Sequence, residues 1–258
     1  MANNWSRDQL LIAVNLYCQL PFGRLHKNNP LIIAAANKIG RTPSALAMKL
    51  CNFASLDPKI TSNGRKGLVG ASYLDREIWA EFIEDPENIG YQSQFMVDQL
   101  AQQDIALSSL SSTEETVDIP SNFYSESTII QSKARVKQAF FRKTVLSSYE
   151  HRCCITGLAE PKLLVASHIV PWSKDEHNRL NPANGLCLSV LHDKAYDQGL
   201  LTITPDFIIR VSNRLLKDQS AMAQDYLCRF NGTTITLPKK FTPNPDFLAY
   251  HFKHVFVQ

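Results

Sequence analysis

Apolar positions recur with helical spacing through the first part of the chain. A capping-box pair, Ser6 and Gln9, precedes the first set. That set comprises Leu10, Leu11, Val14 and Tyr17. Asn29–Pro30 and Thr42–Pro43 each pair a capping side chain with proline at the first helical position. These signals predict three helices, with Gly40 in the short turn between the second and the third.

Two helices joined by a short turn that contains glycine are typical of a helix-turn-helix unit. In the third helix Leu46, Leu50 and Phe53 fall on one face and are expected in the core. The turn, the other faces of this helix and a basic loop after it supply the candidates for contact with nucleic acid. These are Arg41, Ser44, Lys49, Asn52, Arg65 and Lys66. The alternative is a small helical bundle that serves as an interaction or dimerisation module.

A fourth helix is expected over residues 72–82, with Tyr73 and Trp79 anchoring it to the others. It completes a winged-helix-like helical lobe over residues 1–83. Residues 84–128 are rich in Gln, Ser, Asp and Glu, which predicts an acidic linker. Some helical character is expected between residues 91 and 107, and flexibility in residues 108–122. A second domain then occupies residues 129–258.

Charge is distributed unevenly along the 258 residues. Residues 1–83 carry ten basic and five acidic residues, a net charge of +5. Residues 84–128 carry nine acidic residues and neither Lys nor Arg, a net charge of −9. Residues 129–258 carry seventeen basic and ten acidic residues, a net charge of +7. Two basic lobes around an acidic segment are typical of proteins that contact nucleic acid, although solvated surfaces alone produce the same pattern.

The remaining composition indicates a globular protein of the cytoplasm. The six cysteines have no framework spacing, and the N-terminus lacks the basic-then-apolar order of a secretory signal. We therefore expect reduced thiols in a cytoplasmic protein. No apolar run approaches the roughly 18 residues of a membrane span, so no membrane partner is expected.

The C-terminal half mixes short strands with helices, so the chain as a whole is predicted to be α+β. A basic amphipathic helix is expected from residue 129 onward. An apolar strand then ends at His168, a polar loop leads to Asn184, and a second strand follows over residues 185–188. Ser189 caps a helix with His192 in its first turn. Beyond it, residues 200–204 and 207–212 predict a hairpin, followed by short strands to the end, including residues 233–237.

His168, Asn184 and His192 suit the hydrolysis of a phosphodiester. A neutral imidazole can take a proton from water near pH 7, and His168 is assigned that role. A divalent ion on His192 would supply positive charge where the transition state becomes negative. The Asn184 amide can hold a loop carbonyl and amide together and so aim the base. His251 and His254, in the last segment, suit packing instead.

From about Arg135 onward the chain resembles the HNH endonucleases, and within them the branch assigned to bacterial restriction enzymes. The segments that carry the resemblance are CCITG, LLVASHIVPW, NPANGLCLSVLHDKAYDQGLLTI and the closing ITLP and HFKHVF. It implies the ββα-metal fold with a flanking helix and strands. It also implies that His168 is the general base, that Asn184 fixes the loop, and that His192 binds one divalent ion, Mg²⁺ or a similar ion such as Mn²⁺.

The chain departs from the family pattern in two places. Many members carry Asp or His just before the base as a further metal ligand, where this chain has Ser167, a weaker neutral ligand. Asp193 and Asp197 are further candidates near His192. Many members also hold a structural zinc between two Cys-x-x-Cys pairs. Each pair lacks its second cysteine here, so we expect no structural zinc.

Three functions fit these patterns. The first is a metal-dependent endonuclease that cuts double-stranded DNA in restriction or defence, with an N-terminal DNA-recognition lobe. The second is a DNA-binding regulator whose nuclease lobe has decayed, which Ser167 favours. The third is an RNA-directed or toxin-like nuclease whose N-terminal lobe binds protein. A palindromic recognition site would require a homodimer.

Overall fold

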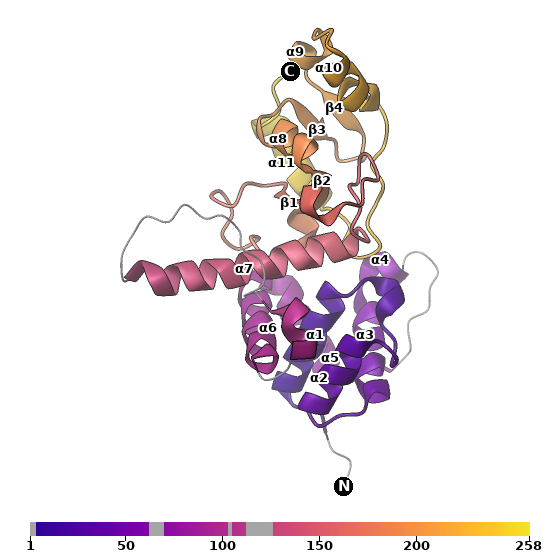
Figure 1. Ribbon diagram of the computed structural model, residues 1–258, viewed down its shortest axis with the longest axis vertical. Helices are drawn as coiled ribbons and strands as arrows, with labels where there is room; N and C mark the ends of the chain where they lie inside the picture. Colours follow the sequence, from indigo (N-terminus) through magenta and orange to yellow (C-terminus); the bar gives the residue numbers. More distant parts are fainter. Residues whose placement is uncertain (1–3, 62–69, 103–104, 112–125) are drawn as a thin grey trace.

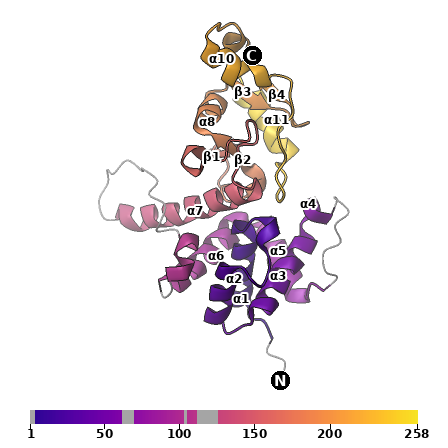
Figure 2. The ribbon, with the colours of Figure 1, turned by 45° about the vertical axis from the view of Figure 1, so that its right-hand side comes forward.

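The computed structural model describes residues 4–61, 70–102, 105–111 and 126–258. Helices α1 to α6 and the 3-10 helix η2 form an N-terminal lobe, and residues 149–258 form a C-terminal lobe of short strands and helices (Figure 1). The long helix α7 lies crosswise between the two lobes, as the turned view also shows (Figure 2). The mixed composition agrees with the α+β prediction. In the described residues no helix is both long and apolar enough to cross a membrane.

The predicted helices of the N-terminal lobe are present with their expected caps. Ser6 forms the capping box with Gln9, and Asn29 and Thr42 cap the next two helices. Leu46, Leu50 and Phe53 are fully buried, as predicted. The helices of this lobe up to the segment predicted as a linker are α1 (Arg7–Gln19), η1 (Phe22–Arg24), α2 (Pro30–Lys38), α3 (Pro43–Leu56), α4 (Pro58–Thr61) and α5 (Tyr73–Glu84).

One of the two predicted anchors of α5 is wrong. Trp79 is 7% exposed and stacks on Phe53, with the ring centroids 6.1 Å apart. Tyr73 is 81% exposed, because it is the first residue of the helix and lies on its solvent side. The buried anchor at the other end of α5 is Phe82, 1% exposed.

The acidic segment differs from the flexible linker that its composition predicted. Asp85 caps helix α6 (Pro86–Ala101), which packs against α1, α5 and α7. Its Ser93 and Gln94 are fully buried and accept hydrogen bonds from the Asn15 amide of α1. Its acidic Asp98 is also buried and accepts from Gln94 Nε2 over 2.9 Å, so the helix carries polar and acidic side chains into the core, which net charge does not reveal. Helix η2 (Ile105–Leu110) follows, and most of the stretch predicted as flexible lies outside the described residues.

Helix α7 (Glu126–Ser148) belongs to both lobes. It packs against α1 and α6 on one side and against strands β1 and β2 on the other. Phe140 points into the N-terminal lobe, edge-on to Phe82 with the centroids 6.4 Å apart. The adjacent Phe141 stacks on His168 of the C-terminal lobe. The two lobes therefore share one helix as a common layer of their cores.

The C-terminal lobe is built on two small antiparallel sheets. Strand β1 (Leu164–His168) pairs with β2 (Gly185–Ser189), and β3 (Leu201–Ile203) pairs with β4 (Ile209–Val211). The second pair is the predicted hairpin. The helical segments of this lobe are η4 (Pro161–Leu163), η5 (Pro182–Asn184), α8 (Val190–Asp197), α9 (Asn213–Leu216), α10 (Ala221–Tyr226), η6 (Cys228–Phe230) and α11 (Pro245–His254).

The prediction of strands to the end of the chain is wrong in two places. In residues 233–237 the sole pairing is an isolated bridge between Ile208 and Thr234. Residues 245–254 form α11, capped by the Asn244 side chain with Pro245 at the first helical position. Its His251 is 2% exposed and packs in the core, as expected, whereas His254 is exposed. All six cysteines are free thiols.

A buried lysine joins the two lobes. Lys240 is fully buried and donates to the carbonyls of Tyr17, Cys18 and Leu20 at the C-terminal end of α1, over Nζ–O distances of 2.5, 2.9 and 2.7 Å. The carbonyls at the end of a helix have no partner within the helix and carry its negative partial charge. A cation from the C-terminal lobe therefore completes a helix of the N-terminal lobe. Burial lowers the pKa of Lys240 to about 8.

Candidate active site

His168 and Asn184 lie together where the β1–β2 pair opens into its loop. His168 is the last residue of β1, opposite Gly185, the first residue of β2. The next residue, Ile169, donates its backbone N–H to the Asn184 carbonyl over 2.9 Å. Both residues thus occupy the strand end and loop end that the sequence predicted.

The Asn184 side chain clamps the loop closed. Its Oδ1 accepts from the Val170 backbone N–H over 2.8 Å. Its Nδ2 donates to the carbonyls of Val170 and Asn178, each over 3.2 Å. Asn184 is 1% exposed, so these bonds form away from water and fix the backbone directly after His168. This is the amide-and-carbonyl arrangement expected of the loop-fixing residue.

The His168 ring is held on three sides. Phe141 of α7 stacks on it with centroids 3.8 Å apart and planes 10° apart, and Trp172 meets it edge-on at 5.4 Å. Its Nε2 lies 2.9 Å from the Arg179 carbonyl. A carbonyl oxygen can only accept, so in the neutral ring Nε2 carries the hydrogen and Nδ1 keeps its lone pair. The loop therefore selects the tautomer with a basic nitrogen at Nδ1.

Burial keeps the His168 ring neutral. Desolvation lowers the pKa of His168 to about 4, helped by the Arg179 guanidinium and opposed by the hydrogen bond to the Arg179 carbonyl. The imidazole is unprotonated at neutral pH and able to accept a proton from water. The approach of a phosphodiester anion would raise this pKa, because an opposite charge stabilises the imidazolium.

His192 lies in the first turn of α8, as predicted. Its Nδ1 is 2.8 Å from the Ser189 hydroxyl, which also caps the helix, and its ring meets Phe230 edge-on at 5.6 Å. His192 is 2% exposed, and burial lowers its pKa, with the Tyr226 carbonyl acting in the opposite direction. Its Nε2 is buried and meets no partner at full hydrogen-bond geometry within the described residues, although the Tyr226 carbonyl acts on the ring as a weak acceptor. A neutral imidazole is the form of histidine that binds a metal ion.

The Ser167 hydroxyl is the second buried polar atom left without a hydrogen bond in the described part of the site. It faces α8, where its nearness lowers the pKa of Asp193 against the larger, raising effect of burial. Within the described residues no group of three or more His, Cys, Asp or Glu side chains is arranged to hold an ion. These donors fit a divalent ion that takes few ligands from the protein and the rest from water and substrate oxygens.

The structure divides the predicted catalytic residues into two groups. His168 and Asn184 are joined through the loop and α7, whereas His192 contacts Ser189 and Phe230. Sequence reasoning missed Phe141, Trp172 and Phe230, whose rings position the two imidazoles. The adjacent pair Phe140–Phe141 was the available signal, since neighbouring residues on a helix face different directions.

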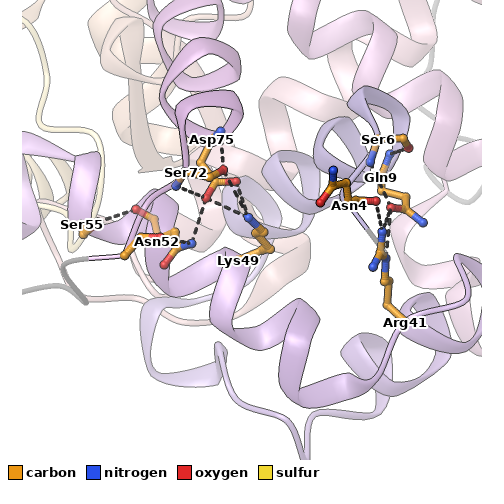
Figure 3. Close-up of polar contacts among 10 residues, drawn as sticks. Asn4, Ser6, Gln9, Arg41, Lys49, Asn52, Ser55, Ser72 and Asp75 are labelled. Atoms are coloured by element: carbon orange, nitrogen blue, oxygen red, sulfur yellow. Dashed lines mark hydrogen bonds and ion pairs between the residues drawn. The ribbon is translucent and has the colours of Figure 1, made fainter. Parts of the chain in front are cut away.

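Two of the predicted nucleic-acid contacts are used inside the N-terminal lobe (Figure 3). Lys49 Nζ lies 2.8 and 2.9 Å from the two carboxylate oxygens of Asp75, whose side chain is fully buried. Asn52 donates to the same carboxylate over 2.9 Å and is 4% exposed. The prediction that Asn52 lies on an outer face of α3 is wrong, because the buried Asp75 of α5 draws its amide inward. The Lys49 ammonium is held in the ion pair with the same Asp75 carboxylate.

The other predicted contacts differ in their surroundings. Arg41 donates to Gln9 Oε1 from Nε over 3.1 Å, and its guanidinium lies 4.7 Å from the Trp5 ring centroid. It thus ties the turn before α3 to the start of α1 (Figure 3). Ser44 is exposed on the first turn of α3. Arg65 and Lys66 lie outside the described residues.

Two antiparallel strands, a loop fixed by Asn184 and a helix with His192 in its first turn form a ββα unit, the arrangement that the resemblance to the HNH endonucleases implies. In agreement, the family model described as HNH endonuclease, HNH_2, matches residues 153–204. The resemblance predicted from the motifs is confirmed over this segment, which contains His168, Asn184 and His192. The match indicates a nuclease, and such enzymes in general hydrolyse phosphodiesters with a divalent metal ion. No curated protein matches the chain.

Replacing Asn184 with alanine is expected to destabilise the protein by about 2–3 kcal/mol, because three buried backbone groups lose their partner. The rate of DNA cleavage should also fall, because the backbone after His168 is no longer held in place. Urea unfolding and a plasmid cleavage assay measure the two effects. The control is Asn88→Ala on the exposed surface of α6, expected to change stability by less than about 0.5 kcal/mol. Equal stability of the two variants would contradict the clamp.

Acid should destabilise the protein through its buried histidines. Burial lowers the pKa of both His168 and His251 to about 4, below the ordinary value of 6.5. Between these values the unfolded chain binds more protons, so the free energy of unfolding falls as pH falls from about 6.5 to about 4. Urea unfolding across this range measures the slope. His251→Phe, which retains an aromatic ring against Tyr196, should make it shallower, and an unchanged slope would refute the assignment.

Proposed function

We propose that the protein is a metal-dependent endonuclease that cuts double-stranded DNA. The observation that carries the proposal is the state of the His168 ring. The ring is neutral, its Nε2 is bound to the Arg179 carbonyl, and its Nδ1 keeps a lone pair. The loop that follows it is held by Asn184. The match of residues 153–204 to the HNH endonuclease model supports the same conclusion. A cytoplasmic role in restriction or defence accords with the resemblance of the motifs to bacterial restriction enzymes.

In the proposed reaction His168 Nδ1 accepts a proton from a water molecule as its oxygen attacks phosphorus. The bond from phosphorus to the 3′ oxygen breaks, and a proton from solvent neutralises the departing oxygen. The products carry a 5′ phosphate and a 3′ hydroxyl. The Arg179 carbonyl stabilises the imidazolium that forms, because it accepts from Nε2. His192 and Ser167 would hold the divalent ion, Mg²⁺ or Mn²⁺, which supplies positive charge at the phosphate.

A plasmid nicking assay tests this function. The purified protein with Mg²⁺ or Mn²⁺ should convert supercoiled plasmid to nicked or linear forms, and EDTA should stop the reaction. DNA binding without cleavage, unchanged by EDTA, would instead favour the second hypothesis, a DNA-binding regulator. Ser167 in place of an acidic ligand, and the separate surroundings of His168 and His192, are the observations that favour it.

We further propose that the N-terminal lobe recognises DNA through the exposed side of α3. Because α7 is shared by both lobes, removal of residues 1–83 would expose the core, so a surface substitution is the better test. Met48→Glu on α3, at a residue 57% exposed, should weaken DNA binding about tenfold by charge repulsion. Ile83→Glu on α5, at a residue 56% exposed, is the matched control. Equal affinities, measured by fluorescence anisotropy with EDTA present, would favour a protein-binding lobe.

A further inference from the structure

A cavity of about 400 Å³ lies at the junction of the lobes, away from His168. The C-terminal end of α1, the start of α2, η2 and the last turns of α7 surround it. Its volume is within the range of sites for small molecules. The nuclease activity proposed above assigns it no role.

The cavity wall is basic. Arg24 and Lys143 line it together with His151, and none of the lining residues is Asp or Glu. Burial lowers the pKa of His151, and Arg142 and Arg24 lower it further, so several cationic groups gather at this end. Lys143 Nζ is anchored to the Ser109 and Ser111 carbonyls over 3.0 and 2.6 Å, which fixes its charge beside the cavity. Arg24 is exposed and available to pair with an anion.

Gln19, on the cavity wall, is held in a network of buried amides. Gln94 Nε2 donates to Asp98 and to the Leu110 carbonyl, so its Oε1 must accept. Gln19 Nε2 donates to that Oε1 and to Asn15 Oδ1. The network therefore fixes the orientation of the Gln19 amide, whose Oε1 is buried and has no hydrogen-bond partner among the described residues. This part of the cavity wall is therefore rigid.

The rest of the wall is aliphatic. Leu20, Leu31 and Leu146 line it with Pro21 and Leu110, and His151 is the one ring among the lining residues. An aromatic base would find a single small ring, His151, to stack on, whereas a compact sugar would meet aliphatic walls on most sides. The anchored Lys143 and the exposed Arg24 together suit a ligand group with more than one negative charge. We propose that this cavity binds a small organic phosphate with a compact carbon skeleton, of the kind found in sugar phosphates and in the ribose phosphate of a nucleotide.

Isothermal titration of the full chain with ribose 5-phosphate, ribose, inorganic phosphate and AMP tests the proposal. Ribose 5-phosphate should bind at least about tenfold more tightly than ribose or inorganic phosphate alone, because only it uses both the cations and the aliphatic wall. If AMP binds more tightly than ribose 5-phosphate, the natural ligand is a nucleotide. If AMP binds equally or more weakly, the ligand is a free sugar phosphate. Ribose 5-phosphate should also raise the midpoint of thermal unfolding.

Two variants locate the binding in the cavity. Arg24→Ala should weaken ribose 5-phosphate binding about tenfold or more, whereas Arg76→Ala, an exposed arginine of α5 outside the cavity, should not. Leu31→Trp should abolish binding by filling the space, with circular dichroism used to verify its fold. The proposal is overturned if ribose 5-phosphate does not bind at about 10 mM, or if Arg24→Ala binds it like the wild type.

Discussion

Cleavage of plasmid DNA should fall by about 10²- to 10⁴-fold when His168 is replaced with alanine, the range expected for loss of a general base. The ring is the neutral group whose tautomer the loop selects, with Nδ1 left basic by the bond from Nε2 to the Arg179 carbonyl. Initial rates of nicking at saturating Mg²⁺ measure the effect. DNA affinity in EDTA should change little, because the role of His168 lies in the proton transfer.

Alanine also removes the ring that stacks on Phe141, so a second variant separates chemistry from folding. His168→Gln retains a terminal amide that can donate to the Arg179 carbonyl but has no basic nitrogen. It should fold like the wild type and cut as slowly as His168→Ala. His254→Ala, at an exposed histidine of α11, is the matched control and should cut at the wild-type rate. Wild-type cleavage by folded His168→Gln would show that another group is the base.

The largest loss of stability should come from Lys240. Lys240→Met has similar length and no donors, so it leaves three carbonyls at the end of α1 buried without a partner. We expect the free energy of unfolding to fall by about 3 kcal/mol or more, because stranded buried acceptors cost more than an ordinary hydrogen bond contributes. Lys240→Ala should be worse, since it also opens a cavity. Urea unfolding at pH 7 measures both.

The neighbouring Lys239 is a matched control, because its side chain is exposed and it differs from Lys240 by one position. Lys239→Ala should change stability by less than about 0.5 kcal/mol. A Lys240→Met protein as stable as the wild type would mean that the desolvation of the ammonium cancels its three hydrogen bonds. The joining of the lobes would then rest on α7 and on apolar contacts such as those of Phe241 with Tyr17 and Trp79.

Local signals predicted much of this fold. The starts of α1, α2, α3 and α8 follow from caps that each lie within a few residues of the helix, and the β1–β2 loop follows from a single motif. The Asn244–Pro245 start of α11 repeats the Asn29–Pro30 signal of α2, so this helix was predictable and was missed. The positions of His168, Asn184 and His192 within the ββα unit could therefore be predicted from the sequence.

The rest depends on contacts distant in sequence. Nothing near Asn52 or Lys49 shows that Asp75 of another helix would draw both inward. The acidic composition of residues 84–128 predicted a linker, whereas the burial of α6 depends on amide partners in α1. Lys240 pairs with residues more than 200 positions away, and the stack of Phe141 on His168 requires the packing of α7 on β1. Such pairings are set by the folded topology, which spacing does not contain.

The sharing of α7 has a consequence for where the protein would cut. Helix α7 packs on α1 and α6 and also on β1 and β2. Because α3 packs on α1, both α3 and His168 are tied to α7, α3 through α1 and His168 through β1. If α3 recognises a DNA sequence, the distance between the recognised base pairs and the phosphate at His168 is fixed by the fold. Cleavage would then fall at a constant number of base pairs from the recognised sequence, and lengthening that spacing by half a helical turn would turn the scissile strand away from His168.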